Sequence, residues 1–162
     1  MRAFVVDVNV AIVANGKAGH ADLDCVGRCI HVLDDISRNG VVVLDDGYRI
    51  LSEYQGRLSR AGQPGVGDAF MKWVWENQAV VERCEQVVLT PIGTGVEDFA
   101  EFPRDAALSS FHRKDRKYVA AALASQRNPE LLNAVDRGYW KHKEALERNR
   151  VRLRFLCPQH ME

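Results

Sequence analysis

Five short apolar runs, separated by segments with helical spacing, constrain the fold of this chain more than any other feature. The runs are rich in β-branched residues and suit buried strands, whereas the segments between them carry apolar residues three and four positions apart. This alternation predicts an α/β layer architecture with five strands. The expected strands are Ala3–Val6, Val41–Leu44, Val87–Leu89, Leu131–Val135 and Val151–Leu156.

The length of 162 residues, with 46% hydrophobic content, predicts one domain over residues 1–162 with a substantial core. Only the last run contains interleaved arginines, Arg152 and Arg154, which predicts an edge strand with one wetter face. The segment from Thr90 to Pro103 contains several Gly and Pro residues without the further residues of a phosphate-binding loop, so we expect a connecting loop there. The expected helices cover residues 22–37, 46–55, 68–77, 104–111, 115–125 and 139–148.

Acidic residues stand where such a fold would expose carboxylates. Asp7 follows the first apolar run and Asp136 follows the fourth, and open α/β sheets bind ligands outside the carboxyl ends of their strands. Glu53 shares one side of its helix with Ile50, which should face the sheet. Asp115 opens a helix, where the helix dipole favours a negative charge.

Taken singly, each of these acids has an ordinary explanation as a helix cap or a solvated surface charge. Taken together they predict a metal site, because crowded carboxylates raise one another's pKa values unless a cation offsets the repulsion. Oxygen ligands without accompanying Cys or His favour Mg²⁺ or Mn²⁺ over Zn²⁺. The predicted ligands are Asp7, Glu53, Asp115 and Asp136.

Four segments carry a resemblance to a known family: Val5-Val6-Asp7-Val8-Asn9, Ile50-Leu51-Ser52-Glu53-Tyr54, the helix that begins at Asp115-Arg-Lys-Tyr-Val, and Val135-Asp136-Arg-Gly-Tyr-Trp. In this order they resemble the PIN domain, the fold of VapC-type toxins and related ribonucleases. The resemblance covers nearly the whole chain. It implies an α/β fold with three α/β/α layers, in which helices cover both faces of a central, mostly parallel five-stranded sheet, and a Mg²⁺- or Mn²⁺-dependent endoribonuclease. It implies that Asp7, Glu53 and Asp115 form the catalytic acidic core, that Asp136 completes the pocket and that Asn9 helps to order it. It also implies a homodimer and, if the protein is a toxin, an antitoxin that occludes the pocket.

The balance of 22 basic and 22 acidic residues offers no bulk attraction for nucleic acid, which counts against an RNA substrate. The local distribution restores that attraction. Lys114 and Lys117 flank Asp115, and Arg137 and Lys141 follow Asp136, so we expect these four side chains to bind RNA phosphates. The alternative for each is a solvated helix face with ordinary charge pairs.

Two other functions remain open. A PIN-like module could bind RNA or protein while holding metal too weakly for turnover. A phosphotransfer protein with an acidic pocket is the second alternative, but such phosphatases have Asp-x-Asp where this chain has Asn9 at the second position. Receiver domains need adjacent acids ahead of their phosphorylated Asp, whereas the pair Asp45-Asp46 follows the second predicted strand.

The N-terminus starts directly with a strand, and no apolar run approaches the ~20 residues that cross a bilayer, so we expect a cytoplasmic protein without membrane association. The four cysteines form no paired CxxC motifs. We therefore expect reduced, partly buried thiols rather than zinc ligands or disulfides at Cys25, Cys29, Cys84 and Cys157.

Overall fold

The fold is built on one parallel sheet. The computed structural model describes residues 1–95 and 97–162, so Val96, one position of the predicted loop from Thr90 to Pro103, lies outside the described residues. All neighbouring strands pair in parallel in the order β3-β2-β1-β4-β5, which confirms the predicted α/β class and the edge position of the last strand. The strands are β1 (Ala3–Val6), β2 (Val41–Asp45), β3 (Cys84–Val87), β4 (Glu130–Asn133) and β5 (Arg152–Phe155).

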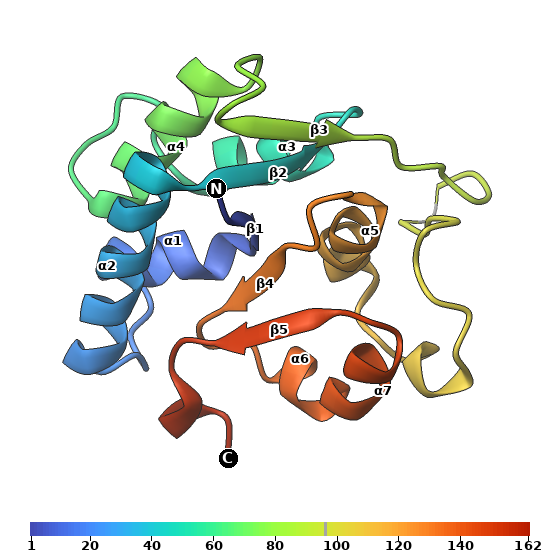
Figure 1. Ribbon diagram of the computed structural model, residues 1–162. Helices are drawn as coiled ribbons and strands as arrows, with labels where there is room; N and C mark the ends of the chain where they lie inside the picture. Colours follow the sequence, from blue (N-terminus) through green and yellow to red (C-terminus); the bar gives the residue numbers. More distant parts are fainter. Residues whose placement is uncertain (96) are drawn as a thin grey trace.

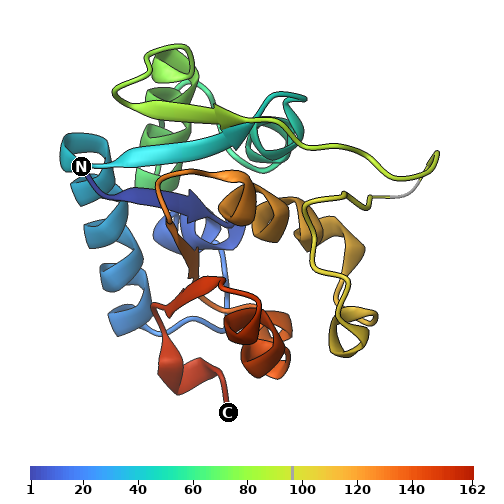
Figure 2. The ribbon, with the colours of Figure 1, turned by 45° about the vertical axis from the view of Figure 1, so that its right-hand side comes forward.

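Helices cover both faces of the sheet (Figures 1 and 2). This arrangement suits an all-parallel sheet, because such strands are apolar on both sides; every residue of β1 and β2 is buried. The helices α1 (Val8–Ala14), α2 (Leu23–Asn39) and α4 (Val66–Asn77) pack on one another, whereas α5 (Arg116–Ala124) packs against β1, β2 and β4. No helix in residues 1–95 and 97–162 combines the length and apolarity needed to cross a bilayer. The remaining helical segments are α3 (Arg49–Arg57), α6 (Arg137–Lys141), α7 (Lys143–Arg148) and the 3₁₀ turns η1 (Ala106–Leu108), η2 (Arg113–Asp115) and η3 (Pro158–His160).

The strand order creates a switch point between β1 and β4. From β1 the chain proceeds outwards through β2 to β3 and then crosses to β4 on the other side of β1. Val5 pairs with Leu131 and Val6 with Leu132, and the Asp7 amide donates to the Leu132 carbonyl at 3.2 Å. Connections leave neighbouring strands in opposite directions at such a point, and α/β proteins commonly bind ligands there.

Several elements differ from the sequence predictions. Helix α1 was not predicted, because the apolar run of β1 continues through it with only Asp7 and Asn9 as polar interruptions. Strand β3 begins three residues before the predicted run at Val87–Leu89 and overlaps it only at Val87. It includes the polar residues Glu85 and Gln86, since it forms the other edge of the sheet. The helix expected over residues 139–148 is divided between α6 and α7, and the one expected over 104–111 is reduced to η1.

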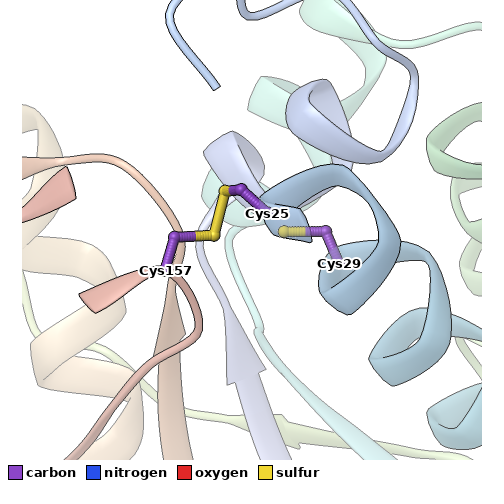
Figure 3. Close-up of side chains that lie close together, drawn as sticks. All are labelled: Cys25, Cys29 and Cys157. Carbon is purple, nitrogen blue, oxygen red and sulfur yellow. A yellow bond between two sulfur atoms is a disulfide. The ribbon is translucent and has the colours of Figure 1, made fainter. Parts of the chain in front are cut away.

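The prediction for the cysteines was wrong for one pair. Cys25 on α2 and Cys157 after β5 form a disulfide, with their Cα atoms 5.2 Å apart (Figure 3). The sequence could not reveal this pair, because 132 positions separate the two residues and only the fold brings α2 beside the segment after β5. Cys29 and Cys84 are free and buried.

Candidate metal centre

Asp7 is the most enclosed of the predicted ligands, with 3% of its surface exposed. It joins β1 to α1 and caps that helix, because its Oδ1 accepts a hydrogen bond from the Asn9 amide at 2.9 Å. Its Oδ2 accepts a hydrogen bond from the Tyr139 hydroxyl at 2.7 Å. Both carboxylate oxygens are therefore held in a fixed orientation at the carboxyl end of β1.

Asp136 is tied to the same place by a pair of asparagines. The Asn9 Nδ2 donates to Asn133 Oδ1 at 2.9 Å, and the Asn9 Oδ1 accepts from the Ala134 amide at 2.8 Å. Asn133, which is fully buried at the end of β4, also accepts from the Asp136 amide at 3.1 Å and donates to the Asp136 carbonyl at 2.9 Å. The Asp136 carboxylate then caps α6 by accepting from the Gly138 amide at 2.8 Å.

Asp115 reaches the site from the start of α5, whereas Asp7 and Asp136 follow strands. It ends η2 and precedes α5, which packs across β1 and β4. Although Asp115 occupies the N-cap position of α5, its side chain makes no capping hydrogen bond in the part of the chain that the structure describes. Helix capping therefore does not explain the position of the Asp115 carboxylate, whereas the carboxylates of Asp7 and Asp136 do cap helices.

The structure brings three of the four predicted acids together. Asp7, Asp115 and Asp136 each offer a carboxylate oxygen, and these oxygens lie within 4.8 Å of one another. We call these residues the aspartate trio. Among residues 1–95 and 97–162, no Lys, Arg or His forms an ion pair with any of the three. The trio is thus a concentration of negative charge with no paired cation from the described protein.

The pKa values of two of these carboxyls reflect that imbalance. Burial, opposed by the hydrogen bonds from Asn9 and Tyr139, raises the pKa of Asp7 to about 6, and the charges of Asp136 and Glu53 raise it further. Burial, followed by the charges of Asp7 and Asp136, raises the pKa of Asp115 to about 8. Both shifts mean that the folded protein resists ionising the trio when no cation is present.

Glu53, the fourth predicted ligand, lies beside the trio rather than in it. Its carboxylate on α3 accepts a hydrogen bond from the Tyr118 hydroxyl and lies 3.3 Å from the Lys117 ammonium. The Tyr118 hydroxyl also accepts from the Val8 amide at 3.3 Å, so Glu53 is connected to the first turn of α1. Its negative charge still reaches the trio, because it contributes to the raised pKa of Asp7.

A hard divalent cation fits the aspartate trio. The donor atoms are all carboxylate oxygens, which Mg²⁺ and Mn²⁺ prefer. The three groups converge from β1, β4 and α5, and the surrounding hydrogen bonds fix two of them independently of any ion. The residues that could hold a cation are Asp7, Asp115 and Asp136, with Glu53 adjacent.

The predicted RNA-binding residues differ in their surroundings. Lys114, Arg137 and Lys141 are exposed. Lys117 is buried, with 9% of its surface exposed, because it pairs with Glu53 and donates to the Lys114 carbonyl. A cleft of about 450 Å³ extends from Lys117, and its lining includes Arg49, Ser52, Phe99, Arg113 and Lys117.

Three residues that order the site were not singled out from the sequence. Tyr118 follows Asp115 by three positions, and Tyr139 follows Asp136 by three, so helical spacing placed each tyrosine on the same side as an acid. That signal was present but not used. Asn133 gave no sequence signal, because a buried amide is recognisable only from the partners that it binds.

Comparisons with known proteins do not assign a family. No protein-family model matches the sequence, and the curated proteins contain no significant match. Among solved structures, a chain in the crystal structure of VapBC2 from Rickettsia felis bound to a DNA fragment from their promoter is similar, with a TM-score of 0.44 and 12% sequence identity. The similarity covers 94% of this chain and 98% of that chain. We base no functional conclusion on a likeness of this degree.

Proposed function

We propose that this protein is a Mg²⁺- or Mn²⁺-dependent endoribonuclease that hydrolyses RNA phosphodiester bonds at the aspartate trio. One observation carries the proposal: three carboxylates converge within 4.8 Å at the switch point of a parallel sheet, without a protein cation paired to them among the described residues. Phosphodiester hydrolysis is the reaction class that such a site supports with few other protein groups.

The residues around the trio have distinct roles in this proposal. A bound divalent cation supplies Lewis acidity, which makes a nearby water more acidic and neutralises charge that develops on the phosphoryl oxygens. Asn9 and Tyr139 orient the carboxylate of Asp7, and Asn133 fixes the backbone at Asp136. Burial keeps the Tyr139 pKa well above its ordinary value, so its hydroxyl remains a hydrogen-bond donor at neutral pH.

RNA is the proposed substrate because exposed cations and a cleft adjoin the site. In this proposal Lys114, Arg137 and Lys141, which are exposed and follow or precede Asp115 or Asp136 closely in sequence, bind the phosphates of the substrate. The cleft beside Lys117 combines Arg113 with an arginine that stacks on an aromatic ring, Arg49 over Phe99 at 5.1 Å. Phe99 is itself buried, so in this proposal the arginines of the cleft contact single-stranded RNA through their charge and their guanidinium planes.

The test is cleavage of a labelled single-stranded RNA by purified protein. We expect cleavage with Mg²⁺ or Mn²⁺, none in EDTA, and a loss of at least about a hundredfold in Asp115→Asn, because the cation loses a ligand. Asp35→Asn, at an exposed position of α2, is the matched control and should cleave normally. Cleavage that persists in EDTA, or in Asp115→Asn, would contradict the proposal. The absence of both cleavage and a saturable Mn²⁺ site would indicate a module that binds RNA or protein instead.

The resemblance to the PIN domain extends the proposal to partners. On that basis we propose that the protein acts as a homodimer and as the toxin of a toxin–antitoxin pair, in which an arginine of the antitoxin enters the trio as its missing cation. Growth arrest on expression, relieved by Asp115→Asn, would support the toxin role. Light scattering on purified protein would measure the oligomeric state.

A further inference from the structure

Three of the four cysteine sulfurs gather at one buried point away from the aspartate trio. The sulfurs of Cys25, Cys29 and Cys157 lie within 4.8 Å of one another, and all three residues are fully buried. Cys25 and Cys29 are four positions apart on one side of α2, and Cys157 begins the segment after β5 (Figure 3). A disulfide uses only two of these sulfurs, which leaves Cys29 as a free thiol in the hydrophobic core beside it.

Thiol–disulfide exchange does not explain Cys29. Exchange requires a thiolate, and Cys29 is fully buried in the hydrophobic core, an apolar environment that disfavours the ionised thiol. In the folded protein Cys29 is therefore a poor nucleophile towards the neighbouring disulfide. A role that uses all three sulfurs at once requires a ligand that stabilises their ionised form.

We propose that, once the disulfide is reduced, Cys25, Cys29 and Cys157 form a thiolate site for one Zn²⁺ ion. Zinc binds Cys sulfur at about 2.3 Å, which places tetrahedrally arranged sulfurs roughly 3.8 Å apart. The three sulfurs already lie within 4.8 Å, so Cys29 needs little movement and the two joined sulfurs need only separate. Soft thiolate ligands distinguish this site from the all-oxygen trio.

The fourth ligand can come from the same turn as Cys157. His160 follows Cys157 by three positions on η3, and residues three apart on a 3₁₀ helix lie on the same side. Its ring already lies against the start of α2, where Nε2 accepts a hydrogen bond from the Asp22 amide at 3.3 Å. Asp22 in turn accepts from the Cys25 amide at 2.8 Å. The spacing Cys-x₃-Cys with Cys-x₂-His would supply four zinc ligands from two segments, but His160 lies outside the group within 4.8 Å, so its ring would have to leave Asp22 to bind the ion.

The two states of the cluster interconvert by a balanced reaction. Two molecules of a small thiol reduce the disulfide: the first forms a mixed disulfide with one cysteine and releases the other, and the second releases the remaining cysteine as the small-thiol disulfide. Cys25 and Cys157 each gain a proton. Zinc binding then displaces the protons of the three thiols. A cavity of about 570 Å³ is lined by Asp24, Leu156 and Pro158, which are the sequence neighbours of Cys25 and Cys157.

The experiment measures zinc in the full-length protein after reduction. Reduced protein is incubated with Zn²⁺, separated from free metal and analysed for zinc and sulfur, with Co²⁺ as a spectroscopic substitute. We expect one thiolate-bound ion per chain and a sulfur-to-cobalt charge-transfer band, which the carboxylates of the trio cannot produce. Oxidised protein should show no band, because it has two free thiols, Cys29 and Cys84, against four in the reduced chain.

Cys29→Ala is the decisive variant and Cys84→Ala is its matched control, since both replace a buried free cysteine. Cys29→Ala leaves the disulfide able to form but should weaken the cobalt band at least about tenfold at limiting metal. Cys84→Ala should keep the band. An absent band in reduced wild-type protein, or an undiminished one in Cys29→Ala, would overturn the proposal. Neither outcome bears on RNA cleavage, so the zinc site and the proposed nuclease can fail independently.

Discussion

Asp98, which is buried, and Asp115, which is partly buried, show how the surrounding charges decide what a carboxylate does to stability. Asp98 lies 3.0 Å from Arg104 and 3.1 Å from Arg116, and these guanidinium groups hold its pKa well below the ordinary value. Asp115 is also largely enclosed but lies among other acids, and its pKa is raised to about 8. The first carboxylate stabilises the fold as an anion, whereas the second opposes folding as an anion.

We therefore predict opposite effects of the same substitution at these positions. In EDTA at neutral pH, Asp115→Asn should raise the free energy of unfolding by roughly 1–3 kcal/mol, because it removes a charge that the folded state disfavours. Asp98→Asn should lower it by a similar amount, because it leaves Arg116 buried without its partner. Denaturant unfolding measures both. If the Asp115→Asn protein had a lower free energy of unfolding than the wild type without metal, burial and repulsion of the trio carboxylates would not be destabilising the fold.

The pKa values of the trio also predict how metal binding depends on pH. Carboxyls whose pKa is raised on folding stabilise the fold below the ordinary value of 3.8, and that contribution is lost as pH rises through about 6 for Asp7 and about 8 for Asp115. A cation offsets the loss, because it binds the ionised form. The increase in melting temperature caused by Mg²⁺ or Mn²⁺ should therefore grow from pH about 5 to about 8. A constant increase over that range would contradict the assignment.

At the scale of elements, the sequence predicted the strands better than the connections. Four of the five strands overlap their apolar runs over most of their length, because buried parallel strands are continuously apolar. Helix α1 was missed for the same reason: periodicity does not separate a short apolar helix from a strand. The break between α6 and α7 at His142 depends on tertiary packing, including the contact of His142 with Phe111, which sequence spacing does not contain.

The asparagine pair between α1 and the end of β4 offers a test of how elements position the site. Asn9→Ala removes the acceptor for the Ala134 amide and the donor to Asn133, so the free energy of unfolding should fall by roughly 1–3 kcal/mol. Because the same bonds align Asp7 with Asp136, Mn²⁺ affinity should fall about tenfold or more. Calorimetric titration measures the affinity.

Asn39→Ala, near the end of α2, is the matched control for Asn9. The Asn39 side chain is exposed and donates to Asp35 on the same helix, so its loss should leave Mn²⁺ binding unchanged. A loss of stability in Asn9→Ala with unaltered Mn²⁺ affinity would show that the pair supports the fold without aligning the carboxylates.

At the scale of the whole molecule, the sequence could suggest that the acidic side chains come together in the fold, but it could not establish it. Asp7 and Asp136 were placed correctly because each follows a strand, and neighbouring parallel strands end at the same edge of a sheet. Whether Glu53 entered the group depended on the competing partners Tyr118 and Lys117, which only the packing of α3 against α5 supplies. The cysteine cluster was missed entirely, since it depends on where α2 and the last segment of the chain meet.

Because the Cys25–Cys157 disulfide joins α2 to the last segment of the chain, we predict that its reduction strongly lowers the stability of the whole chain. The disulfide joins residues 132 positions apart, and a cross-link that closes so long a loop restricts the unfolded chain by about 4–5 kcal/mol in the chain-entropy model. In EDTA, which keeps the reduced cysteines free of metal, a reductant should lower the free energy of unfolding by an amount of that order. Cys157→Ala should unfold like the reduced protein with or without reductant.

Adding Zn²⁺ to the reduced protein tests whether a metal ion can replace the disulfide as the cross-link between these two segments. A thiolate-bound ion joins the same two segments as the disulfide, so Zn²⁺ should restore part of the lost stability to the reduced wild type but not to Cys157→Ala. Denaturant unfolding of the oxidised, reduced and zinc-loaded states gives the comparison directly. If reduction left the unfolding midpoint unchanged in EDTA, and Zn²⁺ did not raise it in the reduced protein, the junction between α2 and the C-terminal segment would be held by packing alone, and neither form of cross-link would contribute to the fold.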